Sequence, residues 1–450
     1  MEYKTDLLIL GTGAAGSSAA FAARKQCPDL SIWMISREDE PEYSEPALPD
    51  LLSGELSMAK VRVKNWEEYR NAGIDVRCRE AVQIDAAAKK VFLDGVDTVS
   101  YGSLILATGS QPIRLRKMAG TDLPGNFVMK SLADVLELEH YQGKRAVVVG
   151  SGAIGIEGSM ALKARGFERV TMVEALDWLS PKSLDKETSD KLQEALERSG
   201  VEVLTGEAVR AVLGEENVEG VETSKRRIPC DVVLWGIGMR PEVQLAKDAG
   251  VELGALGGIR VDDRMRTNLP DIYACGDCAE SLDILSGQPA LHLFWEPAQR
   301  GGAAAGVNAA GGDVPYLGSA AVFLTNKGGL SIAALGKTAA ELDPCTGRIL
   351  QENKNGVFRR LLLEDGYLKG VQMLGTLADI DLFFGNLRRN AMQREGTWDL
   401  RVQIPKDCTT VRDAIFFLRK AEETRYRQEK TPGCAPGVRF IHLSFLRSIP

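Results

Sequence analysis

Residues 6–16 read Asp-Leu-Leu-Ile-Leu-Gly-Thr-Gly-Ala-Ala-Gly, and this stretch decides the fold that the sequence predicts. The apolar run 6–10 is typical of a buried strand, and the glycine pattern GxGxxG follows it directly. Small residues over 17–25 predict a helix, and the apolar run 32–35 predicts the next strand. Strand, glycine turn, helix and strand together form the first half of a doubly wound sheet.

The same pattern returns in the middle of the chain. Residues 145–149 predict a strand, and 150–155 repeat the glycine pattern as Gly-Ser-Gly-Ala-Ile-Gly. Residues 156–165 predict a helix, and 170–173 predict a strand that ends at Glu174. Two such units in one chain are the main organisational prediction.

Each glycine turn has the sequence context that binding of a dinucleotide pyrophosphate requires. Glycines allow a tight turn and close approach of the backbone, and the helix that follows offers free N–H groups to the anion. The alternative is a simple glycine-rich turn between strand and helix. Two copies, each between a strand and a helix, favour the pyrophosphate interpretation.

An acid at the end of the second strand accepts hydrogen bonds from the adenosine ribose in such folds. Glu174 stands at that place in the second unit, and because an acid repels a 2′-phosphate, NADH is favoured over NADPH. In the first unit Ser36 has the equivalent place, and Glu38 follows two residues later. Glu38 either takes the ribose role or is an exposed loop acid.

Composition limits the class of protein. The chain has 450 residues, which suggests about three domains, with 44% apolar and 26% charged residues and a net charge of −7. That charge argues against a general binder of nucleic acids or anionic membranes. No run approaches the roughly 20 apolar residues of a membrane span, and the N-terminal residues do not have the pattern of a signal peptide. We therefore expect a cytoplasmic protein.

Cysteine and histidine are arranged in a way that does not favour a metal site. Of eight cysteines only Cys275 and Cys278 have CxxC spacing, and the chain holds three histidines. A zinc site needs four ligands, so no metal is expected. We interpret the pair as small buried residues and not as a redox dithiol.

Five motifs together carry a resemblance to a known family: Gly11–Gly16, Ala107-Thr108-Gly109-Ser110, Gly150–Gly155, Gly236-Ile237-Gly238 and Ile272-Tyr273-Ala274-Cys275-Gly276-Asp277. Over residues 5–390 the chain resembles the FAD-dependent pyridine nucleotide-disulfide oxidoreductases. The resemblance implies an α/β protein with two Rossmann-like folds, one for FAD and one for NAD(P)H, and a C-terminal α+β interface domain that often makes a homodimer. The expected domains are 1–115 with 240–315 for FAD, 116–239 for NAD(P)H, 316–400 for the interface, and 401–450 as a helical extension and tail.

The resemblance also implies roles for particular residues. Asp277 would bind the ribityl chain of FAD, Glu157 would lie by the nicotinamide, and Trp295 would lie near the flavin ring. The alternatives are a helix-surface acid for Glu157 and core packing for Trp295. The full expected set has Glu157 and Trp295 as catalytic residues and, as cofactor-binding residues, Gly11, Gly13, Ala14, Ala15, Gly16, Glu38, Pro46, Ala107, Thr108, Gly109, Gly276, Asp277, Gly150, Gly152, Ala153, Ile154, Gly155, Glu174 and Gly238.

The departures from the family pattern indicate the type of electron transfer. Members with a single redox cysteine carry it in a segment similar to 43–49, where this chain has Pro46. A pyrrolidine ring is neither a nucleophile nor a source of sulfenic acid. The C-terminal His–Glu pair of glutathione reductase-like members has no match, and Asp50 stands where some members carry a lysine near the flavin. The pattern resembles the thiol-free branch of NADH:rubredoxin and ferredoxin reductases.

The expected activity is therefore electron transfer from NADH through FAD to an external acceptor, such as rubredoxin, ferredoxin or a small oxidant. One alternative is an NADH-sensing flavoprotein that acts through partner binding. Another is a disulfide or persulfide reductase that uses an atypical cysteine. The extension from residue 401, with a capped helix expected over 409–430, has no match in the family.

Overall fold

The computed structural model describes residues 1–391 and 401–429. They divide into two compact units, each described here by itself. The first consists of Met1–Gly143, Leu234–Asp283 and Gly287–Ala320. The second consists of Lys144–Val233, Ile284–Ser286 and the chain from Ala321 onward.

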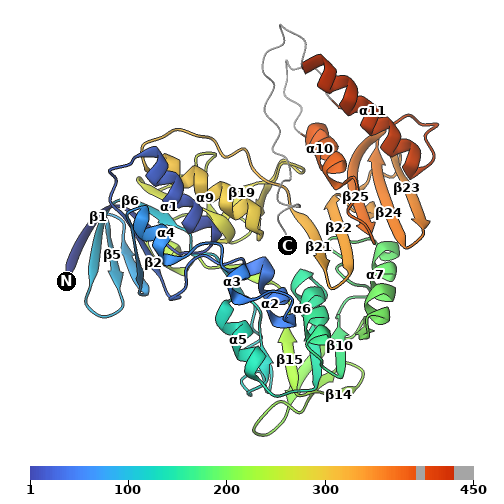
Figure 1. Ribbon diagram of the computed structural model, residues 1–450, viewed down its shortest axis with the longest axis horizontal. Coiled ribbons are helices and arrows are strands. Elements are labelled where there is room, and N and C mark those ends of the chain that lie inside the picture. The colour runs from blue at the N-terminus through green and yellow to red at the C-terminus, as the bar shows by residue number, and fades with distance from the viewer. Residues whose placement is uncertain (392–400, 430–450) are drawn as a thin grey trace. The chain divides into compact units, whose positions relative to one another are not determined.

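The first unit is built on a largely parallel sheet (Figure 1). Its path is β3(Ile74–Cys78), β2(Ile32–Ser36), β1(Glu2–Leu10) and β6(Thr98–Leu106), all parallel, followed by the antiparallel strands β5(Lys90–Leu93) and β4(Ala81–Asp85). The end of β6 also pairs in parallel with β18(Ile272–Ala274).

The register of this sheet brings four distant segments to one edge. Leu10 lies beside Ile35 and Leu106, and Leu106 lies beside Ala274. The residues that follow these strand ends therefore meet at the carboxyl edge of the sheet, where ligands bind in this architecture.

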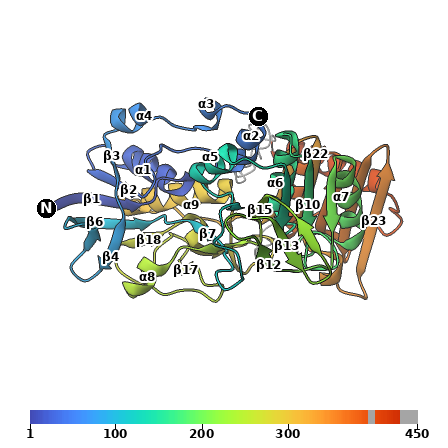
Figure 2. The same ribbon diagram turned by 90° about the horizontal axis from the view of Figure 1, so that it is seen from below.

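Two helices, α1(Ala14–Gln26) and α9(Trp295–Ala309), run side by side in both views (Figures 1 and 2). Their close approach depends on glycine. A Cβ atom on Gly302 would lie 2.1 Å from the carbonyl oxygen of Ala15, and one on Gly306 would lie 2.1 Å from that of Ala19. The backbone of α9 therefore packs directly on the backbone of α1.

The helix α1 begins at Ala14, three residues before the predicted start. The second half of the glycine motif forms its first turn, and Gly13 is the N-cap. The same holds for α6(Ala153–Ala164), where 156 was predicted. In both cases the small residues of the motif are themselves helical, so that the free N–H groups of the first turn lie at the bend.

Short elements complete the first unit. β7(Ser110–Pro112) and β16(Met239–Pro241) form an antiparallel ribbon. The others are η1(Glu45–Ala47), α2(Leu48–Ser53), α3(Met58–Val61), α4(Trp66–Asn71), β8(Asn126–Phe127), α5(Leu132–His140), α8(Gln244–Asp248), β17(Ile259–Arg260), η2(Gly276–Cys278), β19(Ala279–Leu282) and β20(Pro289–Leu291).

The second unit contains a second parallel sheet and a small antiparallel one. Its strands β11(Val201–Leu204), β10(Arg169–Val173) and β9(Arg145–Val149) pair in parallel, and β15(Val232–Trp235) follows β9 in the strand order. The predicted strand 145–149 is confirmed. Two helices, α6 and α7(Lys186–Arg198), pack against this sheet. The antiparallel sheet is β12(Val209–Leu213), β13(Gly220–Thr223) and β14(Arg227–Pro229).

An antiparallel five-stranded sheet follows in the same unit, as expected for an α+β region. Its order is β21(Val322–Lys327), β22(Leu330–Gly336), β25(Tyr367–Leu374), β24(Val357–Glu364) and β23(Gly347–Lys354), with η3(Ala339–Glu341) between β22 and β23. Two helices, α10(Ile380–Ala391) and α11(Val411–Glu429), share its apolar core through Phe383, Leu387 and Leu418.

The predicted cap of the last helix is present, because the Asp413 N–H donates to the Thr410 hydroxyl at 3.1 Å. The end of the expected tail, 430–450, lies outside the described residues. Within the described part of the chain, no helix is long and apolar enough to cross a membrane.

Candidate functional site

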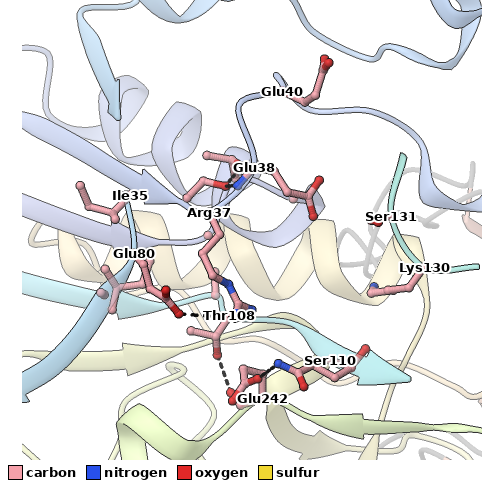
Figure 3. A pocket seen from close by; sticks show the side chains of 18 of the residues that line it. Ile35, Arg37, Glu38, Glu40, Glu80, Thr108, Ser110, Lys130, Ser131 and Glu242 are labelled. Atoms are coloured by element: carbon pink, nitrogen blue, oxygen red, sulfur yellow. Dashed lines mark hydrogen bonds and ion pairs between the residues drawn. The ribbon is translucent and has the colours of Figure 1, made fainter. Parts of the chain in front are cut away.

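A cavity of about 620 Å³ lies in the first unit at the carboxyl edge of its sheet (Figure 3). The turns after β1, β2 and β6 line it, together with Lys130 and Ser131 ahead of α5 and Glu242 after β16. Figure 3 shows that the labelled side chains come from several separate segments of the unit. The strand register described above is the reason why segments so distant in sequence share one cavity.

The glycine turn after β1 closes only without side chains. Gly11 has a φ of +117°, and a Cβ there would lie 2.1 Å from the Ala107 carbonyl oxygen. A Cβ on Gly16 would meet the carbonyl of Gly11. The N-terminus of α1 has no side-chain cap and no acidic residue in its first turn. Its N–H groups thus remain available to an anion in the cavity.

Charged side chains converge beside this turn. Lys130 forms an ion pair with Glu45, and its Nζ lies 3.6 Å from Oδ2 of Asp277. The Ser110 hydroxyl donates to that same Asp277 oxygen at 2.6 Å. Burial opposes the charge on Lys130, but the negative charges of Glu45 and Asp277 still raise the pKa of Lys130. The ammonium group therefore stays charged between two carboxylates.

Glu38 faces the cavity from the segment after β2, and it is tied into the protein by Tyr43. The Tyr43 hydroxyl donates to Oε2 of Glu38 at 2.8 Å and accepts from the Leu132 N–H at 3.2 Å. Burial, with the charge of Glu38, raises the pKa of Tyr43 well above its ordinary value. Tyr43 is therefore a permanent donor that holds the Glu38 carboxylate in place.

The motif after β6 is anchored to the opposite wall. The Thr108 hydroxyl donates to the Glu242 carbonyl at 2.6 Å, as the dashed line in Figure 3 marks. Gly109 has a φ of +72°, and a Cβ there would meet no atom within 4 Å. Gly276, with a φ of +75°, would bring a Cβ within 2.7 Å of Ala15. One glycine is thus required by conformation alone, and the other by conformation and by contact with α1.

This arrangement fits FAD. The cavity combines an uncapped helix N-terminus, at a turn that excludes side chains, with a charged lysine beside that turn. Its lining also includes Glu38, whose carboxylate can accept hydrogen bonds from hydroxyl groups, and Asp277 lies beside Lys130. When bound, FAD supplies the redox chemistry. The protein residues supply binding, orientation and electrostatics.

The second unit contains a glycine turn of the same kind, which we call, like the first, a glycine cradle. Gly150 has a φ of +96°, and a Cβ on Gly155 would lie 2.0 Å from its carbonyl oxygen. Gly152 is the N-cap of α6, which again has no side-chain cap and no acid in its first turn. The same physical features therefore fit a second dinucleotide.

Glu174 lies beside this second turn and is buried. Its Oε2 accepts from the backbone N–H of Ser151 at 3.0 Å and from the Ser151 hydroxyl at 2.6 Å, and its Oε1 accepts from the Leu176 N–H at 2.9 Å. A carboxylate has about four acceptor positions. One position therefore remains for a ribose hydroxyl.

The remaining expected residues lie on these same elements. Glu157 is a buried residue of α6, and Trp295 is the first residue of α9, where it packs against the core of the first unit. Gly238 has a φ of +112° and accepts a hydrogen bond from Ile113 N–H at 3.0 Å. Pro46 lies in η1, and its neighbour Glu45 lines the cavity. Ala14, Ala15, Ala153 and Ile154 form the first turns of α1 and α6.

Cys275 and Cys278 are fully buried, as expected for small core residues. The Cys278 thiol lies 3.3 Å from the carbonyl oxygens of Leu106 and Cys275. Burial raises the pKa of both thiols. Since the thiolate is the reactive form, neither thiol is activated.

Sequence reasoning missed several residues that line the cavity. Lys130, Glu45, Glu242 and Arg79 come from segments without a glycine motif or a fixed spacing to one. The sequence did give a signal for Glu45, because it is next to Pro46, which was predicted to bind the cofactor. Lys130 had none, because its place at the cavity depends on how the chain returns after β8.

Comparison with known proteins places the chain in a family. The model of the pyridine nucleotide-disulphide oxidoreductase family matches residues 5–302. An NADH oxidase of Methanocaldococcus jannaschii is 35% identical over 347 residues, which are 74% of this chain and 76% of that protein. A rubredoxin-NAD(+) reductase of Pseudomonas putida is 31% identical, over 62% of this chain and 74% of that protein.

A solved structure shares the fold over nearly the whole length. The ferredoxin reductase of Rhodopseudomonas palustris superimposes with a TM-score of 0.81 at 24% identity, over 93% of this chain and 99% of that one. The chain therefore belongs to the pyridine nucleotide-disulphide oxidoreductase family and is an NAD(P)H oxidoreductase that uses FAD.

Proposed function

We propose that NADH reduces FAD and that the reduced flavin passes its electrons directly to an external acceptor, such as a small redox protein. One observation carries this proposal: among the described residues that line the FAD cavity, none is a cysteine. The segment that resembles the redox-cysteine segment of the family has Pro46. A route through a protein thiol therefore lacks its nucleophile.

The buried pair Cys275 and Cys278 does not supply that nucleophile. Both thiols are fully buried with raised pKa values, so neither offers a thiolate to a disulfide or persulfide substrate. The rubredoxin-NAD(+) reductase among the relatives supports a protein acceptor. We therefore favour a rubredoxin-like or ferredoxin-like partner over a sulfur substrate.

We propose the following functions for the domains of the chain. Residues 1–115 and 240–315 hold FAD, 116–239 hold NADH, 316–400 form an interface domain, and 401–450 are an extension. The two glycine cradles support the cofactor assignments. Glu38 and Asp277 are proposed to bind FAD, Glu174 the adenosine ribose of NADH, and Glu157 and Trp295 to act near the reacting rings, together with the remaining motif residues named above.

We also propose a homodimer in the cytoplasm. The family resemblance supports the dimer, since its C-terminal domain often forms one. The seven cysteines of the described residues are all free, which is typical of a reducing compartment. Sedimentation of the full chain tests the dimer, with a monomer as the contradicting result.

The activity is tested by anaerobic stopped-flow spectroscopy. NADH should bleach the visible flavin bands, and a rubredoxin or ferredoxin should restore them within the turnover time. Protein alkylated beforehand with iodoacetamide should do both at an unchanged rate. Loss of reoxidation after alkylation would contradict direct transfer, and flavin that no carrier reoxidises would favour a sensor.

A further inference from the structure

The carboxylate of Glu45 lies where an anion is expected to bind. A Cβ placed on Gly13 would be 3.7 Å from Oε1 of Glu45, so this oxygen lies over the N-cap of α1. That N-cap is the point at which an uncapped helix attracts a phosphate. The pyrophosphate of FAD and the Glu45 carboxylate therefore compete for one region of positive potential.

Lys130 is the charge that both anions share. It comes from the segment before α5 and is paired with Glu45, with Asp277 at 3.6 Å. The charged or ionisable groups that face Glu45 are Lys130, Asp277, Glu38 and Tyr43. The single cation Lys130 thus lies among three carboxyl groups at the turn where the pyrophosphate of FAD would add two further negative charges.

The whole cavity has the same imbalance. Seven carboxyl side chains line it, against four cationic ones. Accessible surface makes up 36% of the Glu45 side chain, and since Glu45 lines the cavity, a bound ligand would cover part of it. Binding of a pyrophosphate therefore adds negative charge and removes water from Glu45 at the same time. Both effects disfavour the ionised carboxylate.

We propose that Glu45 takes up one proton from solvent when the pyrophosphate of FAD binds, and that Lys130 then pairs with the phosphate in place of Glu45. This inference rests on the proposed FAD site and adds a proton linkage to it. The step balances, because the carboxylate becomes a carboxylic acid and the ion pair of Lys130 passes to the incoming anion. FAD affinity is then set by pH through a residue next to the proline that replaces the family's cysteine.

The electrostatics of the ligand-free site agree in direction. Burial raises the pKa of Glu45 against the opposing charge of Lys130, and Asp277 and Glu38 raise it further. The bound pyrophosphate dianion raises the pKa of Glu45 further. Between the pKa of Glu45 in the free protein and its pKa in the complex, the complex therefore holds more protons than the free protein. In that window FAD binds more tightly as pH falls. Above the pKa of the complex, no proton is taken up.

The test is the dissociation constant of FAD from the full-length protein between pH 6 and 9, read from the flavin fluorescence released on dilution. The expected result is a weakening of up to tenfold per pH unit across the window, as linkage to one proton requires. Glu45→Gln should bind FAD more tightly at pH 9 than the wild type and lose most of the pH dependence. Lys130→Gln should weaken FAD binding at every pH.

Glu40 supplies the matched control. It lines the same cavity, but its carboxylate is paired with Arg62 at 2.9 Å. Glu40→Gln removes the same charge and should leave the pH dependence intact. If Glu40→Gln abolishes it equally, the effect is one of general charge and the assignment to Glu45 is wrong.

A second measurement needs no variant. Titration calorimetry in buffers of different ionisation enthalpy counts the protons taken up per FAD by the wild type. A count of zero across the pH range, with tight FAD binding, would overturn the inference and leave the proposed function intact. A wild type that does not bind FAD at any pH would overturn the proposed function itself.

Discussion

The packing of α9 against α1 offers a sharp test, because two adjacent glycines of one helix differ in their surroundings. A Cβ on Gly302 would lie 2.1 Å from the backbone carbonyl of Ala15. A Cβ on Gly301 would have its nearest neighbours, Met265 Cε and Cys275 Cβ, at 3.5 and 4.0 Å. The first contact requires the two helices to separate, whereas the second is ordinary van der Waals contact.

The magnitudes follow from that difference. Replacing glycine by alanine inside a helix contributes up to about 1 kcal/mol of stability from backbone propensity, and Gly301→Ala should retain most of it. Overpacking costs about 1–3 kcal/mol, so Gly302→Ala should be destabilised by up to about 2 kcal/mol after the same gain of about 1 kcal/mol. Its FAD affinity should also fall, because α1 carries the pyrophosphate turn.

The assay compares urea midpoints followed by circular dichroism, and FAD release followed by fluorescence, for both variants and the wild type. Because its free energy of unfolding falls by up to about 2 kcal/mol, Gly302→Ala should lower the urea midpoint, while Gly301→Ala should leave it unchanged or raise it. If both variants behave alike, contact between the two helix backbones does not position the FAD turn, and the reasoning is refuted.

Three further predictions concern single side chains. Glu174→Gln should raise the KM for NADH about tenfold with little change in kcat, because it loses a charge-assisted hydrogen bond to the bound ribose. An unchanged KM in steady-state kinetics would argue against contact between Glu174 and NADH. Cys275 and Cys278 should resist Ellman's reagent at pH 8 until denaturant is added, because burial raises their pKa values, and rapid reaction by mass spectrometry would contradict this. Burial raises the pKa of Glu42, whose partner Lys64 is 3.7 Å away, so the folded state favours the protonated acid. Glu42→Gln should therefore have a higher urea midpoint than the wild type at pH 8, and this difference should disappear toward pH 4. A difference that does not change with pH would contradict the prediction.

Lys130 and Glu45 illustrate the limit of sequence reasoning at this site. They are 85 residues apart in the chain and form an ion pair at the cavity. Glu45 lies in the segment 43–49, beside the predicted Pro46, but Lys130 stands in no motif. The position of a lysine side chain relative to a distant turn depends on chain path and not on local spacing. Similarly, the sequence suggested a ribose-binding role for Glu38 without showing that Tyr43 holds its carboxylate.

The sequence by itself determined the two glycine cradles, the strands that precede them and the helices that follow. These depend on local properties: the positive φ of Gly11 and Gly150, and the closeness of Gly16 and Gly155 to the carbonyls five residues before them. Only the tertiary structure decided which charges face the FAD cavity. Parallel pairing aligns the ends of strands that are far apart in sequence, and burial then sets the charge and reactivity of the side chains enclosed there.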